Sequence, residues 1–276
     1  TEMSDPAGTA SNAVIDATNH SGNLTLSSAF KTTATDLFSI TLGAGKNSIT
    51  FGTEGLSGDK VVGTTGTDTV KMTEAATDLA MTVTDVDNLG LYGAGATKSI
   101  SMKNATVTTV DIYDNAAADN GTDNIKVTNL NQAVNIHSTS ATSADWDGDT
   151  ITLDMLTGVT ALSATIKGGV ALEGTGILNT DATSLNITDA NTVAATGLYM
   201  DQALVVAGTT AASTITSLTL AGGGASGATT TATLSMDGTS NVNVSTINAA
   251  SLESDLDING LTTAAGTAIT LNATGQ

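Results

Sequence analysis

The densest group of residues able to do chemistry is a short acidic run around the only tryptophan of the chain. Carboxylates at alternate positions beside a glycine turn can direct several oxygens at a hard cation such as Ca²⁺. The helix-loop-helix calcium motif needs glycine sixth and glutamate twelfth, whereas Gly148 is fourth here and Leu156 is twelfth. The run is therefore either a calcium site of another kind or a solvated acidic turn. Its candidate ligands are Asp145, Asp147, Asp149 and Asp154.

A second acidic group is more widely spaced and lies in residues 111–123. We predict a further calcium candidate there, with three ligands. Gly-Thr-Asp fragments at 66–68 and 121–123 match pieces of the calcium-binding nonapeptide G-G-x-G-x-D, but no two full nonapeptides follow one another. The candidate ligands of this second group are Asp114, Asp119 and Asp123.

Catalytic chemistry finds little support in the residue types. Asp145, Asp147 and Asp149 could instead supply the acid/base pair of a polysaccharide hydrolase, which needs two carboxylates at a defined separation. One tryptophan and three tyrosines leave little aromatic surface for sugar stacking, and the chain has no arginine to dock uronates. It has no cysteine and only two histidines, His20 and His137, which lie far apart. We therefore predict no enzymatic activity.

The elements that must position these residues are short β-strands. Apolar and polar residues alternate in about 22 bursts, on average about 12 residues apart, which is the spacing expected of an all-β chain. Examples are 39–42, 110–113 and 184–187. Aromatic residues make up only 3% of the chain, too few for the thick layers of a sandwich or barrel. We predict a β-solenoid, or parallel β-helix, whose thin core is filled by small residues.

Two further expectations concern the organisation of this solenoid. Residues 1–28 are rich in turn formers and are expected to be a loose N-terminal segment or linker, with the solenoid domain over 29–276. Asparagines near strand ends either form hydrogen-bonded ladders between coils or are ordinary turn residues. These asparagines are Asn186, Asn241, Asn243, Asn259 and Asn272.

The charge of the chain limits its partners. Acidic residues number 27 against 8 basic ones, for a net charge of −19, so a nucleic-acid partner is excluded on electrostatic grounds. The chain contains no run of about 18 apolar residues, so we predict no membrane span. After Lys167 there is no positive charge. That part of the surface stays uniformly negative in solvent, or meets divalent cations or a basic partner.

The composition, together with phrases such as those at 66–70, 184–188 and 268–272, resembles the surface-layer proteins of Gram-negative bacteria. These proteins are rich in Gly, Ala, Thr, Asn and Asp, poor in arginine and cysteine-free, and are related in style to calcium-binding repeat proteins exported by type I secretion. The resemblance covers the whole chain. It implies a β-solenoid that assembles outside the cell into a lattice or fibre, with Ca²⁺ bridging acidic surfaces.

We therefore expect a structural, self-assembling protein of the bacterial cell surface, present as a homo-oligomeric lattice or filament. A cell-surface glycan or lipopolysaccharide is a further expected partner. The alternatives are an adhesin or autotransporter-like rod that binds host or neighbouring cells and, third, a polysaccharide-active β-helix enzyme. Calcium-dependent polymerisation distinguishes the first from the second. Product release from acidic polysaccharides would identify the third.

Overall fold

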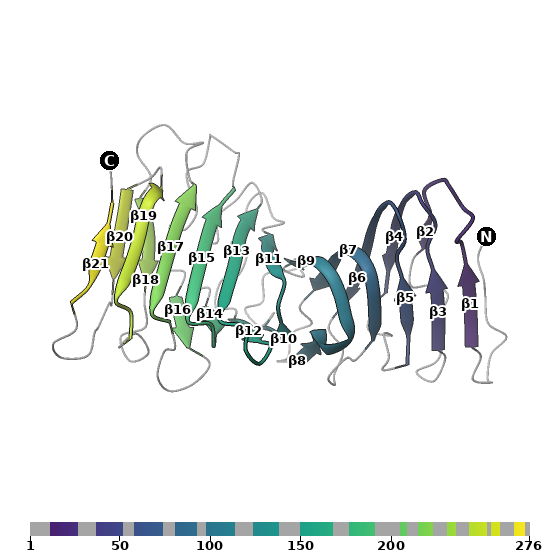
Figure 1. The fold of residues 1–276 in the computed structure, drawn as a ribbon, viewed down its shortest axis with the longest axis horizontal. Coiled ribbons are helices and arrows are strands. Elements are labelled where there is room, and N and C mark those ends of the chain that lie inside the picture. The colour runs from purple at the N-terminus through teal and green to yellow at the C-terminus, as the bar shows by residue number, and fades with distance from the viewer. Residues whose placement is uncertain are drawn as a thin grey trace.

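The chain folds into a solenoid built almost entirely of parallel β-strands, which confirms the predicted fold class (Figure 1). The strands stand across the long axis, with β1 near one end and β21 near the other. The computed structural model describes residues 12–26, 37–51, 58–73, 81–92, 98–113, 124–137, 150–167, 177–190, 205–208, 215–222, 231–235, 243–252, 255–259 and 268–273.

The strands are short, as the bursts of alternation predict. In the part of the chain that the structure describes, one 3₁₀ turn, η2 (Met102–Asn104), separates β8 from β9. The strands are β1 (Asn12–Asp16), β2 (Thr25–Leu26), β3 (Leu37–Thr41), β4 (Lys46–Thr50), β5 (Lys60–Val62), β6 (Thr67–Thr73), β7 (Thr82–Tyr92), β8 (Lys98–Ser101), β9 (Ala105–Tyr113), β10 (Ile125–Leu130), β11 (Ala133–His137), β12 (Thr150–Met155), β13 (Ala161–Lys167), β14 (Ile177–Thr180), β15 (Ser184–Asp189), β16 (Val205–Gly208), β17 (Ser217–Gly222), β18 (Thr231–Ser235), β19 (Thr246–Leu252), β20 (Asp255–Asn259) and β21 (Thr270–Asn272).

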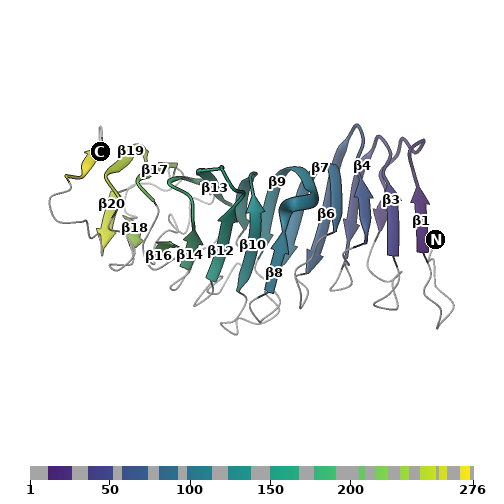
Figure 2. The same ribbon diagram turned by 60° about the horizontal axis from the view of Figure 1, so that its bottom comes forward.

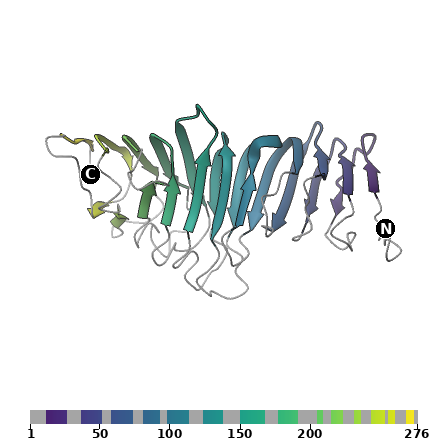
Figure 3. The ribbon, with the colours of Figure 1, turned by 90° about the horizontal axis from the view of Figure 1, so that it is seen from below.

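Strands pair in parallel with their counterparts in the neighbouring coils. The largest sheet follows the order β1-β3-β5-β7-β9-β11-β13-β15-β17-β19-β21, with β2, β4 and β6 joined through β7. A second sheet has the order β16-β14-β12-β10-β8, and β18 pairs with β20. Because successive coils lie in register, their strands stack side by side along the rod (Figure 2 and Figure 3).

The core is a set of aliphatic columns that run along the rod. Side chains of a strand point alternately to the two faces of its sheet, so every second residue enters the interior. In the longest column every side chain from Ile49 to Leu220 is at most 2% exposed. This burial removes apolar surface from water and is the main force that holds successive coils together. The column consists of Ile49, Val70, Leu89, Val110, Val134, Ala164, Ile187 and Leu220.

One face of the solenoid is replaced by another near the middle of the rod. In the N-terminal part, the first face consists of β1, β3, β5 and the early residues of β7 and β9. The second face runs from β2, β4 and β6 through the later residues of β7 and β9 to β11 and the odd-numbered strands beyond. A third face begins at β8 and continues in β10, β12, β14 and β16. The first face therefore ends at β9, where the third has just begun.

Residues 12–26 belong to the solenoid, although the composition of 1–28 predicts a loose terminus or linker. β1 pairs with β3 and β2 pairs with β4. The reason is the apolar pattern: Ile15 lies opposite the fully buried Ile40 and extends its column. Turn-rich composition does not prevent a strand where a neighbouring coil supplies both hydrogen bonds and an apolar surface.

Side-chain ladders between coils are present, but a buried one lies where the sequence analysis did not place it. The amide of Asn47, which is 2% exposed, donates to the carbonyls of Gly43 and Gly45 and to Asp68 Oδ1 at 2.7 Å. The backbone N–H of Asp68 donates in turn to Asp87 Oδ2 at 2.7 Å. Among the predicted asparagines, Asn186 lies opposite a serine and donates to its Oγ at 3.5 Å, and Asn272 lies opposite Asn248; Asn259 pairs in β20 with β18, and Asn241 lies outside the described residues.

Candidate functional site

The structure describes one of the seven predicted calcium ligands. Asp154 on β12 has its Oδ2 2.9 Å from Nζ of Lys126 on β10, so its charge is already paired with a cation of the neighbouring coil. No group of three or more histidines, aspartates or glutamates that could hold a metal ion occurs within the described ranges. The remaining six candidates, Asp114, Asp119, Asp123, Asp145, Asp147 and Asp149, lie outside those ranges, and their calcium sites stay predictions.

A polar cluster on the second face joins two successive coils. Asp111 on β9 accepts a hydrogen bond at 2.7 Å from the amide of Asn135, and its same Oδ1 lies 2.8 Å from Nε2 of His137. Asn135 and His137 both lie on β11, one coil further along. The histidine that the sequence leaves isolated is therefore placed against a carboxylate that it shares with an amide.

Aromatic rings stack beside this carboxylate. The ring of Tyr113 lies 4.8 Å from that of Tyr92 at 14°, and 4.4 Å from that of His137 at 19°. Nζ of Lys71 lies 5.4 Å from the centre of the Tyr113 ring. A Cβ on Gly90 would come within 3.1 Å of both the Lys71 and Tyr113 side chains, so a glycine gives the ring its room. Because these rings face one another, their stacked faces are not open to a sugar ring.

Burial and hydrogen bonding set the electrostatics of this cluster. Burial of Asp111 raises the pKa of its carboxyl, but the hydrogen bonds from His137 and Asn135 and the positive charges nearby outweigh burial and lower it overall. Burial raises the pKa of Tyr113 to about 12, with the Asp111 carboxylate and Tyr92 adding to the effect. A carboxylate that orients an imidazole is also found in hydrolase triads. Here its bonds tie neighbouring coils together.

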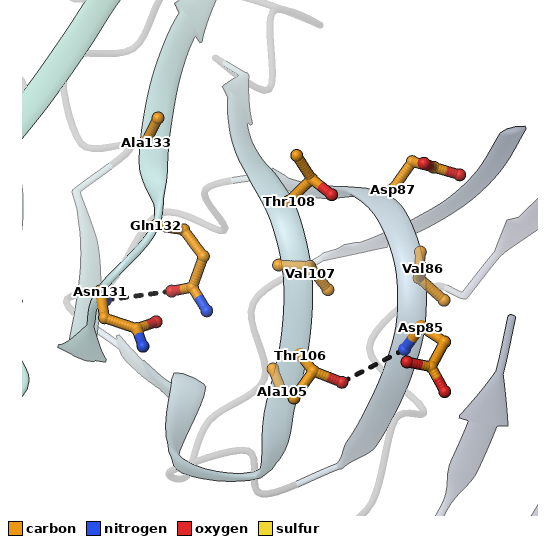
Figure 4. A pocket seen from close by; sticks show the side chains of 10 residues that line it. All are labelled: Asp85, Val86, Asp87, Ala105, Thr106, Val107, Thr108, Asn131, Gln132 and Ala133. Carbon is orange, nitrogen blue, oxygen red and sulfur yellow. Dashed lines mark hydrogen bonds between the residues drawn. The ribbon is translucent and has the colours of Figure 1, made fainter.

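A groove of about 610 Å³ opens where the first face ends, and we treat it as the candidate functional site (Figure 4). Its walls come from three coils. Residues 105–108 of β9 form one side, and 131–133, leading into β11, form the other. Residues 85–87 of β7 lie beyond β9. The polar side chains that line it are Asp85, Asp87, Thr106, Thr108, Asn131 and Gln132.

Local backbone geometry creates the groove. Two neighbouring coils differ in the number of residues between the same two register pairs, Ser101↔Thr128 and Thr109↔Ala133. The β8–β9 coil has seven residues there (102–108), and the next coil has four (129–132). The shorter coil turns sharply at Asn129, whose φ is 57°. Positive φ is tolerated by asparagine better than by most residues. The following coil thus bypasses residues 105–108 and leaves the space beside them open.

The acidic side of the groove lies at a bend in β7. Asp85 has a φ of 55°, and its backbone N–H donates to Thr106 Oγ1 at 3.2 Å. The Asp85 residue is exposed, whereas Asp87 is half-buried and accepts the bond from Asp68. Because neither aspartate belongs to a recognisable motif, the sequence analysis missed both. A signal was present in the sequence: the alternation of apolar residues at Met81 and Val83 shifts by one position at Val86, which marks the bend.

Comparison of the chain with protein-family models, with curated proteins and with solved structures finds no match. Within the described residues, no helix is long and apolar enough to cross a membrane. The geometry of the solenoid and of its grooves and edges is therefore the basis for a functional proposal.

Proposed function

We propose that this chain is a structural protein of the bacterial cell surface that self-assembles through the ends of its solenoid. The observation that carries this proposal is an exposed core column at β21. Leu271 is 56% exposed, whereas its register neighbour Ile247 is 1% exposed. The earlier members of the same column, Leu162, Leu185 and Leu218, are fully buried.

The backbone of β21 adds hydrogen-bonding capacity to this apolar edge. Within the described residues, β21 pairs only with β19. At the opposite end, β1 pairs only with β3 within the same limits, and Val14 is 70% exposed. Open strand edges recruit other strands, and solenoid repeats bury their core only against a neighbour. A second copy stacked on β21 would bury Leu271 as Ile247 is buried now.

The negative charge of the chain opposes such stacking, and calcium could reduce this repulsion. Copies that each carry a net charge of −19 repel one another at low ionic strength. We propose that Ca²⁺ lowers this repulsion by bridging acidic surfaces of neighbouring copies. The proposed activity is assembly without catalysis, and its product is an extracellular filament or lattice.

Negative-stain microscopy and analytical ultracentrifugation in EDTA and in millimolar Ca²⁺ test this function. We expect ordered filaments or sheets in calcium that dissolve in chelator. Leu271→Glu should abolish assembly, because it places a charge in the column to be buried. Thr270→Glu is the matched control, since it adds the same charge to an adjacent exposed residue of β21 and leaves the column intact.

Monomeric particles in both conditions would overturn the proposal and favour the adhesin alternative. Equal assembly of Leu271→Glu and the parent chain would show that the contact lies elsewhere than at β21. Circular dichroism of each variant verifies that the solenoid has formed. Leu271 is already largely exposed, so its replacement should leave the fold intact.

A further inference from the structure

The first face ends at β9, and we call this place the junction. The groove at the junction contains a stretch of sheet edge that no neighbouring strand covers within the described residues. On one side, residues 105–107 of β9 pair with β7. On the other side, pairing of the next coil stops at Thr128 and resumes at Ala133, opposite Thr109. Within the described residues, the backbone of 105–108 therefore has no strand partner on that side, over about 13 Å at roughly 3.3 Å per residue.

The same stretch contains the last residues of a core column, and these residues are only partly covered. In the first face, Ile40, Val61 and Val83 are stacked in register and at most 1% exposed. The next member, Ala105, is half-buried, and so is Val107. Thr106 and Thr108 alternate with them and are exposed. A strand laid beside β9 would cover Ala105 and Val107 with every second side chain.

The charge of the groove selects among extended chains. Of the two carboxylates in its lining, Asp85 is exposed and Asp87 is half-buried. Among the described residues, the lining contains no lysine, histidine or aromatic side chain. An anionic or nucleic-acid chain would meet repulsion here, and a sugar would find no ring to stack on. A cationic side chain on the added strand would find a partner at Asp85.

We propose that this groove binds an extended, lysine- or arginine-bearing peptide segment, which adds a strand to the open edge of β9. Backbone hydrogen bonds to residues 105–108 supply the affinity, as in strand addition by other peptide-binding sheets. Small apolar side chains of the peptide cover Ala105 and Val107, and its basic side chain reaches Asp85. Gln132 and Asn131 line the opposite wall, where Figure 4 shows their side chains beside the groove.

The probe is a fluorescein-labelled six-residue peptide in which valine alternates with lysine and threonine, titrated with the chain and followed by fluorescence anisotropy. We expect saturable binding. A peptide with glutamate in place of lysine should bind at least tenfold more weakly, since like charges then meet at the groove. Peptides N-methylated at alternate residues, in either of the two phases, should also be compared. One phase should lose binding at least tenfold, because strand addition requires N–H groups on the side facing β9.

The protein variant that tests the charge is Asp85→Asn, which should weaken binding of the lysine peptide about two- to fivefold, as for an exposed ion pair. Asp16→Asn is its control, since it removes the same charge from an exposed aspartate in β1 and should leave binding unchanged. Amide hydrogen exchange gives a second reading. Saturating peptide should slow exchange at residues 105–108 and leave exchange in β17 and β19 unaltered.

Three results would overturn the proposal. The first is no binding at millimolar peptide with no change in exchange at 105–108. The second is equal binding of the parent peptide and both N-methylated peptides, which excludes strand addition. The third is displacement of the peptide by neutral oligosaccharides, which would identify the groove as a sugar site. Because the test uses monomeric chain in EDTA, its outcome does not depend on assembly through β21.

Discussion

The two parts of the solenoid, before and after the junction at β9, have equally buried cores but differ in how regularly the coil length repeats. Before the junction, the register partners Ile40, Val61 and Val83 lie 21 and 22 residues apart. After it, Val134 and Ala164 lie 30 apart, and Ile187 and Leu220 lie 33 apart. The columns are equally well buried in both parts. Core packing therefore tolerates extra residues as long as these enter between strands, where loop length has a small entropic cost.

The corners of the coils differ as well. In the N-terminal part, the corner ladder is buried and uses amide and carboxylate groups, with the Asn47 amide donating three bonds. In the C-terminal part it is exposed and uses hydroxyls: Thr183 donates to the carbonyl of Thr160, Thr216 to Thr183, and Ser245 to Thr216. A hydroxyl ladder needs only one short bond per coil, so it persists between coils of unequal length. The three-group ladder requires coils of nearly equal length.

The largest loss of stability is expected from substitutions in the core columns, one in each part of the solenoid. Leu89→Ala in the N-terminal part and Leu220→Ala in the C-terminal part each remove a fully packed leucine and should each cost about 2–5 kcal/mol. In a solenoid each coil contacts only its neighbours, so each variant should destabilise its own part most. Urea unfolding with hydrogen exchange by mass spectrometry measures both. Equal loss of protection throughout the rod would show that the two parts unfold as one unit.

The corner ladders should differ in what they contribute. Asn47→Ala removes the amide that donates to the carbonyls of Gly43 and Gly45 and to Asp68 Oδ1. It also removes the oxygen that accepts from the Leu24 N–H, and should cost about 1–3 kcal/mol. Thr216→Ala removes one exposed hydroxyl bond and should cost less than about 1 kcal/mol. Thermal and urea unfolding of the two variants compares the ladders directly. A larger loss from Thr216→Ala would reverse our account of the corners.

The smallest effect at neutral pH is expected at the aromatic stack. Burial, the Asp111 carboxylate and Tyr92 raise the pKa of Tyr113 to about 12, above its ordinary value of 10. A group with a raised pKa stabilises the fold fully below pH 10, and this contribution is lost as the pH rises toward 12. Tyr113→Phe should therefore behave like the parent at pH 7 and lose less stability above pH 10. The difference in absorbance at 295 nm between the two chains isolates the Tyr113 titration, and a midpoint near 10 would contradict the prediction.

Much of the fold could be predicted from local patterns, and less of the candidate site. Alternation at 39–42, 110–113 and 184–187 identified strands because the period of two depends only on neighbouring residues. The turn-rich composition of 1–28 does not indicate β1, since Ile15 is placed by its pairing with a residue of the next coil. Asp85 and Asp87 were not singled out, because their role comes from a length difference between two coils. His137 could not be paired with Asp111 without the register that places them together.

The sequence by itself determined that the chain is a thin, acidic, all-β solenoid, because strand period, the scarcity of aromatic side chains and net charge are properties of composition and local order. Only the tertiary structure decided which residues meet. Register between coils is set by which apolar side chains stack, and that depends on the lengths of the intervening segments. The tertiary structure thereby placed Asp111 against His137, ended one face at β9, and left the edge at 105–108 and the column at Leu271 open.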